Sequence, residues 1–362
     1  MKLPWYHIRN LLWIIPLTLA ICLQAGYAAA GEPAQMIEWY LSDMAPAQIR
    51  TGELAGKGYG DKTNWRLIAA MPEYQHRIVV ANVKRKMTDL KQKPNACACG
   101  MIRTPERAEY ALFSESVGLA LANSVVVPRR KERLIAPALD ADGAVDLDKV
   151  LSAGLSLAVR SGRAYGDFLD GFVSKARERR QLLVMPEALK TGESTLGMLN
   201  AGRADFSLLF PIELEFAMRN EKFDGRFTSY PVAGASPFTV YGVACAKSPI
   251  GEKIIAAINP VIQKNRDNYY AFIYRSWLPP SSVALYEKLH QETFNQAIQP
   301  VKDLDEIEKV VGAIADCLQA GAVWHQGQCD RSQVPPPVPE NEKPLSSTSD
   351  KSSLINVSAL VP

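Results

Sequence analysis

The chain of 362 residues is 47% hydrophobic and 22% charged, which is typical of a globular protein with enough apolar surface for about two domains. Its formal net charge is +3, from 41 basic and 38 acidic residues. Residues 1–30 hold two of the basic residues, Lys2 and Arg9, and no acid, so the remaining chain carries +1. A nearly neutral chain has no extended basic surface, which excludes nucleic acid as a partner and makes the basic run at 129–131 a solvated linker.

Residues 1–30 have the pattern of a secretory signal peptide. A short lead carries three basic or imidazole side chains, Lys2, His7 and Arg9. An apolar run at 11–23 follows, and the small residues at 28–30 suit cleavage after Ala30. About thirteen apolar residues are short for a bilayer span, although an uncleaved membrane anchor is the alternative interpretation. A lipoprotein is disfavoured because the bulky Ile21 precedes Cys22 where a small residue is required.

Export changes how the cysteines are interpreted. Five remain after removal of the signal: Cys97, Cys99, Cys245, Cys317 and Cys329. An oxidising compartment favours at least one disulfide, and an odd count leaves one thiol over. Cys317 and Cys329 close a short loop and are the preferred pair, whereas Cys97 and Cys99 lie on one face of a strand and would bridge only with strain. No histidine lies at ligand spacing from the Cys-x-Cys pair, so we expect no metal site and no cofactor.

The first part of the chain alternates strand and helix patterns. Strands are predicted at 37–43, 77–83 and 96–102, and helices at 63–74 and 84–92. The first of these helices has Thr63 or Asn64 as its cap. The order strand, helix, strand indicates a parallel sheet with helices on both faces.

A second unit repeats this architecture with different residues. A strand at 122–130 leaves the first unit, and the second opens at 140–154. Its predicted strands and helices lie at 155–162, 164–180, 181–185, 194–202 and 204–210. The helix at 164–180 places five apolar residues on one stripe: Tyr165, Phe168, Leu169, Phe172 and Ala176. A strand at 238–248 then leads into a helix capped by Ser248 with Pro249 at its first position. Further helices reach about Gly321, and the Pro- and Ser-rich residues 331–362 predict a disordered tail.

The run GMIRTPERAEYALFS, residues 100–114, is the strongest indication of a binding site. Thr104 and Pro105 begin a helix, and Arg107 lies in its first turn. Unpaired N–H groups at a helix start attract anions, and a guanidinium adds a forked donor. The pattern therefore predicts an anion site.

Together with the order of the elements, this run resembles the type II periplasmic binding proteins, in particular solute-binding family 3 of ABC uptake systems. The matching residues are Gly100, Thr104, Arg107, Phe113 and Ser114, with supporting segments at 52–61, 145–162 and 199–209. The resemblance covers about residues 36–300. It implies an α/β protein with two lobes, each a mixed or parallel sheet flanked by helices, which close on a ligand as a Venus flytrap.

The resemblance also implies a division of the chain. Lobe I would comprise 31–124 and return at 241–330 with the C-terminal helices, and lobe II would comprise 125–240. Two hinge strands would cross near 123–127 and near 238–244.

Site residues follow from the resemblance one at a time. Arg107 would hold an anionic group of the ligand, with Thr104 and the backbone around Ile102 assisting. The second lobe would contribute the turn made by Arg160, Ser161 and Gly162. The alternative for Arg107 is a salt bridge to Glu106, Glu109 or another lobe residue.

Departures from the family pattern affect the ligand. The aspartate that takes an amino acid's ammonium in the family falls on Phe210, the family's aromatic after the first-lobe proline is Ala47, and Ile102 replaces a threonine. An ammonium without its carboxylate in a dry cleft is costly, so an α-amino acid held in the usual way is not expected. Asp43, Glu213 or Glu215 are possible substitutes. Four side chains near the first-lobe strand end are candidates for the cleft wall: Trp39, Tyr40, Met44 and Tyr59.

The expected function is that of a monomeric periplasmic protein that binds a small anionic or polar, amino-acid-like ligand and delivers it to an inner-membrane ABC permease. A ligand-sensing adaptor of the same fold, acting on a membrane sensor, is the alternative. An enzyme such as a dehydratase on this fold is disfavoured, because no Ser-His-Asp or Cys-His arrangement, Gly-rich phosphate loop or paired carboxylates stand out.

Overall fold

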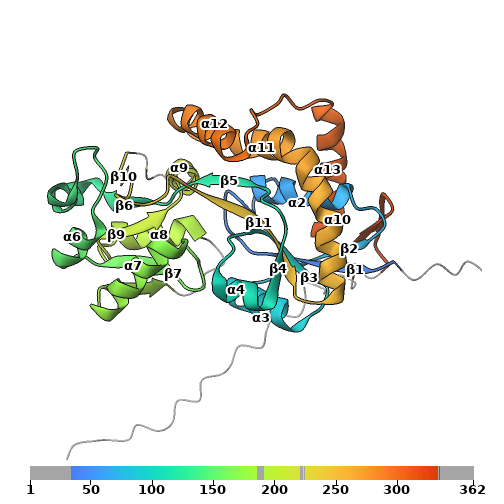
Figure 1. Ribbon diagram of the computed structural model, residues 1–362, viewed down its shortest axis with the longest axis horizontal. Helices are drawn as coiled ribbons and strands as arrows, with labels where there is room; N and C mark the ends of the chain where they lie inside the picture. Colours follow the sequence, from blue (N-terminus) through green and yellow to red (C-terminus); the bar gives the residue numbers. More distant parts are fainter. Residues whose placement is uncertain (1–33, 186–190, 221–222, 224, 333, 335–362) are drawn as a thin grey trace, which may run out of the picture.

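A computed structural model describes residues 34–185, 191–220, 223, 225–332 and 334 of the chain (Figure 1). The predicted signal peptide, with Cys22, and nearly all of the predicted tail lie outside the described residues. No helix in the described ranges has both the length and the apolar character that crossing a membrane requires.

The first sheet has eight strands and forms the larger lobe. Their order is β13-β12-β2-β1-β3-β11-β4, with β5 paired to β11. The strands are β1 (Met36–Leu41), β2 (Gln75–Val80), β3 (Ala96–Met101), β4 (Ala111–Phe113), β5 (Gly118–Leu121), β11 (Phe238–Ala246), β12 (Val323–His325) and β13 (Gln328–Asp330). β1 runs parallel to β2 and β3, whereas β11 runs antiparallel to β3, β4 and β5. The predicted parallel unit is confirmed for the three N-terminal strands.

The second sheet has five strands in the order β10-β6-β9-β7-β8. Its strands are β6 (Ser124–Pro128), β7 (Leu157–Arg160), β8 (Leu182–Met185), β9 (Phe206–Leu209) and β10 (Phe227–Tyr230). β7 is parallel to β8 and β9, and β6 is antiparallel to β9 and β10. Both sheets are mixed, as the resemblance implied.

Helices cover both sheets and separate into the same two lobes (Figure 1). Those of the first lobe are α2 (Tyr59–Ala69), α3 (Val83–Gln92), α4 (Pro105–Tyr110), α10 (Pro249–Asn265), α11 (Ala271–Arg275), α12 (Pro280–Phe294) and α13 (Leu304–Gln319). A π-helical turn, Arg266–Tyr270, joins α10 to α11. Those of the second lobe are α5 (Glu132–Ile135), α6 (Leu147–Ser152), α7 (Asp167–Glu178), α8 (Thr191–Asn200) and α9 (Pro211–Asn220).

Helix α2 begins four residues before the predicted cap. Its N-cap is Gly58, and the Asp61 carboxylate accepts the Gly58 amide at 3.3 Å. A Cβ at position 58 would lie 2.5 Å from the carbonyl oxygens of Pro46 and Ala47, so only glycine fits this approach. The Thr63 hydroxyl instead donates to the Tyr59 carbonyl inside the helix. The start of α2 is therefore set by a tertiary contact, which the helix propensities of the residues do not reveal.

The chain passes between the sheets at two places. β5 ends at Leu121 in the first sheet, and β6 begins at Ser124 in the second. The return lies at 231–237, because β11 belongs to the first sheet from Phe238 onward. The second crossing is therefore earlier than the expected 238–244.

Helix α7 follows its predicted stripe except at one residue. Four members are buried in the second-lobe core: Tyr165, Leu169, Phe172 and Ala176. Phe168 is 55% exposed. Its spacing, three residues after Tyr165 and four before Phe172, places it at the edge of the stripe, and the second-lobe core does not cover that edge.

Two disulfides link elements of the first lobe. The predicted Cys317–Cys329 pair is confirmed, with α13 and β13 joined. A second disulfide, Cys97–Cys245, joins directly facing residues of β3 and β11 and was not predicted. Cys99 is the free, buried cysteine among those described.

The buried His76 makes the stability of the first lobe sensitive to acid. The Trp39 indole N–H donates to Nδ1 at 3.1 Å, and Nε2 lies 2.8 Å from the Met71 carbonyl, which is the pattern of a neutral imidazole. Burial lowers the pKa of His76 to about 4. The folded pKa lies below the unfolded one, so this contribution is complete above about pH 6.5 and is lost as the pH falls toward about 4.

Replacing His76→Gln should therefore flatten the acid side of the stability profile. Between about pH 7.5 and about pH 5 the wild type is expected to lose about 2 kcal/mol more unfolding free energy than the variant. Urea unfolding at the two pH values measures the difference. Equal losses in the two proteins would mean that His76 does not titrate as its burial requires.

Candidate functional site

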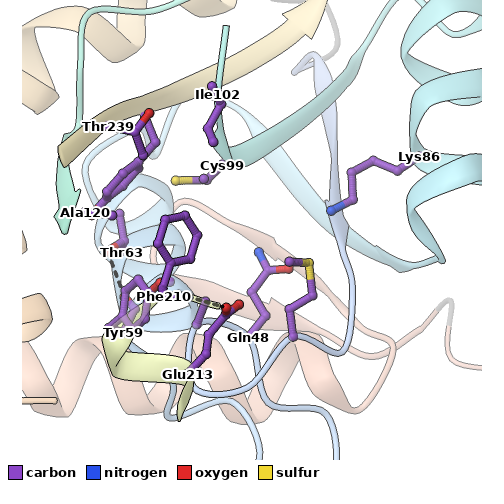
Figure 2. Close-up of a pocket in the computed structure, with 15 residues that line it drawn as sticks. Gln48, Tyr59, Thr63, Lys86, Cys99, Ile102, Ala120, Phe210, Glu213 and Thr239 are labelled. Carbon is purple, nitrogen blue, oxygen red and sulfur yellow. Dashed lines mark hydrogen bonds between the residues drawn. The ribbon is translucent and has the colours of Figure 1, made fainter. Parts of the chain in front are cut away.

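A cavity of about 100 Å³ lies between the two lobes (Figure 2). Most of its lining comes from the first lobe: Met44, Ala47, Gln48, Tyr59, Gly60, Thr63, Lys86, Cys99, Gly100, Ile102, Ala120, Thr239 and Tyr241. The second lobe contributes Phe210 and Glu213. The first-lobe residues include those that follow the ends of β1 and β3 and those at the start of α2, which is where open α/β sheets bind ligands.

A loop between β1 and α2 forms one wall and is held by a buried carboxylate. Asp61 accepts the amide of Ile49 at 2.8 Å and pairs with the Arg50 guanidinium. Burial raises the pKa of Asp61 to about 6, although Arg50 and the amides counteract it. Within the loop, the Gln48 side chain accepts the Ser42 amide at 2.8 Å. The wall that carries Gln48 is thus fixed to the start of α2 before any ligand binds.

The opposite wall carries a buried ion pair. Arg163, in the loop after β7, donates through Nη1 to Oε1 of Glu213 at 2.9 Å and through Nη2 to Oε2 at 2.8 Å. Nη2 also lies 3.1 Å from Oδ1 of Asn123, at the first crossing between the lobes. The two charged side chains are 7% and 8% exposed. Burial opposes the charge on Arg163, but Glu213 outweighs it and raises the pKa of the guanidinium.

Phe210 packs against this ion pair and lines the cavity beside Glu213. Its amide donates to Oε2 of Glu213 at 3.1 Å, and its ring lies 4.9 Å from the Arg163 guanidinium carbon. Figure 2 shows the ring directed into the cavity. The Tyr165 ring lies 5.2 Å from the same carbon. Glu213 and two aromatic rings therefore surround Arg163.

The cavity thiol is neutral. Cys99 and Lys86 both line the cavity (Figure 2). Burial raises the pKa of Cys99 to about 12, so the thiol remains protonated and is a poor nucleophile at neutral pH. Over the described ranges, no group of three or more His, Cys, Asp or Glu side chains has the arrangement of a metal site.

Two of the nine predicted site residues line the cavity, Ile102 and Phe210. Arg107 and Thr104 lie beside it. The Thr104 hydroxyl caps α4 by accepting the Arg107 amide at 3.2 Å, as the motif predicted. Arg107 Nη1 donates to the Ile102 carbonyl at 2.9 Å, and burial lowers the pKa of its guanidinium. Its observed partner is thus the backbone of a lining residue, and neither Glu106 nor Glu109 pairs with it.

The predicted second-lobe turn faces the first lobe outside the cavity lining. Gly162 has φ +73°, and a Cβ there would lie 3.1 Å from the Cγ1 atom of Val83. The Ser161 amide donates to the Met185 carbonyl at 3.2 Å, and the Arg160 amide to the Tyr165 hydroxyl at 3.4 Å. Arg160, Ser161 and Gly162 therefore build a turn that meets the start of α3.

Two further predicted residues have other surroundings. Tyr40 is fully buried, and its hydroxyl lies 2.9 Å from Glu38 and 2.8 Å from Asp89, while Lys93 donates to it at 2.8 Å. This polar cluster lies in the first-lobe core and not in the cavity lining. Asp43 is in the loop wall and accepts the amide of Arg50 at 3.2 Å. Arg163, which the sequence reasoning missed, adjoins Gly162, so the predicted turn was the available signal.

Comparisons with known proteins agree on the fold. No protein-family model and no curated protein sequence matches the chain. An ancestral arginine-binding protein bound to arginine is similar with a TM-score of 0.52 and 14% identity, covering 68% of this chain and 100% of that one. A histidine kinase sensor domain with similarity to periplasmic binding proteins gives 0.51 and 14%, covering 68% and 98%.

A third similar structure comes from work on glutathione import via GshT and the cystine ABC importer TcyBC of Streptococcus mutans. It has a TM-score of 0.50 and 16% identity, and the match covers 75% of this chain and 99% of that one. Identities this low show a shared architecture only. The chain therefore has the two-lobed Venus flytrap fold of the type II periplasmic binding proteins.

Proposed function

We propose that this chain is a monomeric periplasmic solute-binding protein that closes its lobes on a small anionic or polar ligand for ABC-type uptake. The observation that carries the proposal is the cavity whose lining comes from both lobes. A ligand in it contacts both lobes at once, so it binds the closed form more tightly and shifts the population toward closure. The similar structures associated with arginine binding and with glutathione import support a small ligand and a membrane partner.

The lining supports a polar or anionic group on the ligand. Lys86 brings a positive charge to the first-lobe wall, and Gln48, Thr63 and Thr239 bring hydrogen-bonding side chains. The aromatic residues Tyr59, Phe210 and Tyr241 offer apolar surface. The cavity thus combines a few polar groups with a mainly apolar lining, as ligand sites commonly do.

Native mass spectrometry of protein purified without refolding tests the proposal. We expect the mature protein to retain a small molecule whose readdition to stripped protein raises the midpoint of thermal unfolding with the logarithm of its concentration. A substrate consumed during the assay would point instead to an enzyme. If the protein retains no small molecule and no small molecule raises its midpoint of thermal unfolding, the proposal loses its basis.

Arg107 is proposed to bind the ligand's anionic group from beside Ile102. If it does, Arg107→Ala should weaken binding of the retained molecule about thirtyfold or more, because truncating a hydrogen-bonded charge that the bound ligand buries costs about 2–5 kcal/mol. Isothermal titration calorimetry measures the change. Glu109→Ala, an exposed position on the same helix, is the control. If Arg107→Ala leaves the affinity unchanged, Arg107 does not bind the ligand, and its role is limited to the hydrogen bond with the Ile102 carbonyl.

The sensor alternative is favoured by an apolar contact between the lobes. Helix α9 of the second lobe packs on α11 and α12 of the first, and the rings of Phe216 and Trp277 are 5.9 Å apart. The hydrophobic cluster at this contact contains Ile212 of α9 together with the first-lobe residues Tyr274, Leu278, Tyr286 and Leu289. Separating such surfaces exposes them to water, which opposes opening of the lobes. A flytrap that stays closed suits a sensor better than a delivery protein.

Small-angle scattering of ligand-free protein tests this contact. For the sensor, the wild type should scatter as the closed form, and Trp277→Ala should have a larger radius of gyration. Leu285→Ala, on the exposed side of α12, is the matched control and should leave the scattering unchanged. An open wild type without ligand would favour the transport function.

A further inference from the structure

The cavity lining contains one carboxylate among the described residues, that of Glu213. A ligand ammonium in a site shielded from water requires such a partner, because an unpaired charge there loses its hydration without compensation. Whether the cavity accepts an ammonium therefore depends on what Glu213 already binds.

Both Glu213 oxygens are engaged within the protein. Oε1 accepts from Arg163 Nη1, while Oε2 accepts from Arg163 Nη2 and from the Phe210 amide. The two parallel N–H···O bonds have the forked geometry in which arginine binds carboxylate most strongly. The pair has no net charge, so it offers an ammonium little attractive field, and these three bonds leave a free lone-pair site on Oε1 alone.

The position of Arg163 also prevents its easy displacement. Its guanidinium lies between the rings of Phe210 and Tyr165 and reaches Asn123 through Nη2. An incoming ammonium would have to take Glu213 from a buried cation that has no other carboxylate among its observed contacts. The ring of Phe210 points into the cavity and covers one face of the Arg163 guanidinium (Figure 2).

We propose that Arg163 determines the specificity of the cavity: by neutralising Glu213, it selects small ligands that have an apolar body and lack an ammonium group. This inference rests on the proposed ligand-binding function and specifies its ligand class. Arg163 acts through Glu213 and Phe210, so it is a positioning residue.

Matched pairs of probes that differ only in the amino group test the inference. L-phenylalanine is compared with 3-phenylpropionate, and L-leucine with 4-methylpentanoate, by thermal unfolding and calorimetry on the stripped full-length mature protein. We expect the des-amino members to bind the wild type at least about tenfold more tightly, as expected for an unpaired buried charge. Equal or tighter binding of the amino acids would overturn the proposal.

Two variants extend the test. Arg163→Met frees the Glu213 carboxylate and should reverse the preference toward the amino acids, whereas the double variant R163M/E213Q, with neither charge, should not. Because Arg163→Met risks misfolding, Glu213→Gln is measured as well. It keeps the guanidinium without its counter-charge and should bind the des-amino carboxylates about tenfold more tightly than the wild type. A folded Arg163→Met that still rejects amino acids, or a Glu213→Gln without tighter carboxylate binding, would overturn the role of Arg163.

The specificity role of Arg163 can be wrong while the proposed ligand-binding function is right, and the retained ligand distinguishes the two cases. A retained ligand that contains an amine would overturn the role of Arg163 and leave a ligand-binding protein.

Discussion

Replacing Cys97 and Cys245 together by alanine is expected to lower the free energy of unfolding by about 5 kcal/mol. The disulfide joins facing positions of β3 and β11 across a sequence separation of 148 residues. A crosslink that closes so long a loop removes much of the entropy of the unfolded chain, about 5 kcal/mol by loop-closure scaling. Urea unfolding of the oxidised wild type and of the double variant measures the loss.

The second disulfide is the matched control. Cys317 and Cys329 are 12 residues apart, so the corresponding double variant should lose about 3 kcal/mol. Both variants remove a first-lobe disulfide, but Cys97 and Cys245 are fully buried whereas Cys329 is exposed, so the first variant also loses core packing. A smaller loss for the Cys97–Cys245 variant than for the control would contradict the dominance of loop closure.

Replacing Arg163→Met alone is expected to destabilise the protein by about 3–5 kcal/mol, because it leaves the buried Glu213 carboxylate without its partner. The same side chains are 7% and 8% exposed, so water does not compensate for the lost pair. The double variant R163M/E213Q should recover most of the loss, since replacing both charges removes the uncompensated one.

A double-mutant cycle completed with Glu213→Gln measures this coupling by denaturant unfolding. Additive losses in the cycle, with no recovery in the double variant, would show that the two side chains stabilise the lobe independently. The cycle also identifies which of the variants are folded well enough for the ligand measurements.

Much of the fold was predictable because it depends on local patterns. The β-branched and apolar runs at β1, β2 and β3, the stripe on α7, and the caps Thr104 and Ser248 all act over a few residues. The predictions were wrong where packing against residues distant in the sequence sets the end of an element or the burial of a side chain. The start of α2 depends on Gly58 meeting the carbonyls of Pro46 and Ala47, and Phe168 lies outside the core although it adjoins the buried stripe.

The candidate site was predicted less completely, for a physical reason. Ile102 and Phe210 follow strand ends, so their place in the lining is encoded by the strand pattern. Arg163, by contrast, becomes significant only through Glu213, which lies 50 residues further along the chain. No period or motif connects two such positions before the sheet and α9 bring them together.

The sequence alone determined the two α/β units, the resemblance to a two-lobed binding fold and the absence of the usual ammonium partner at Phe210. These properties depend on residue type and short-range order. Tertiary structure alone decided that Glu213 is neutralised by Arg163, that Arg107 binds the Ile102 carbonyl, and that Cys97 pairs with Cys245. Each of these contacts depends on distances between segments remote in sequence, which only packing of the lobes establishes.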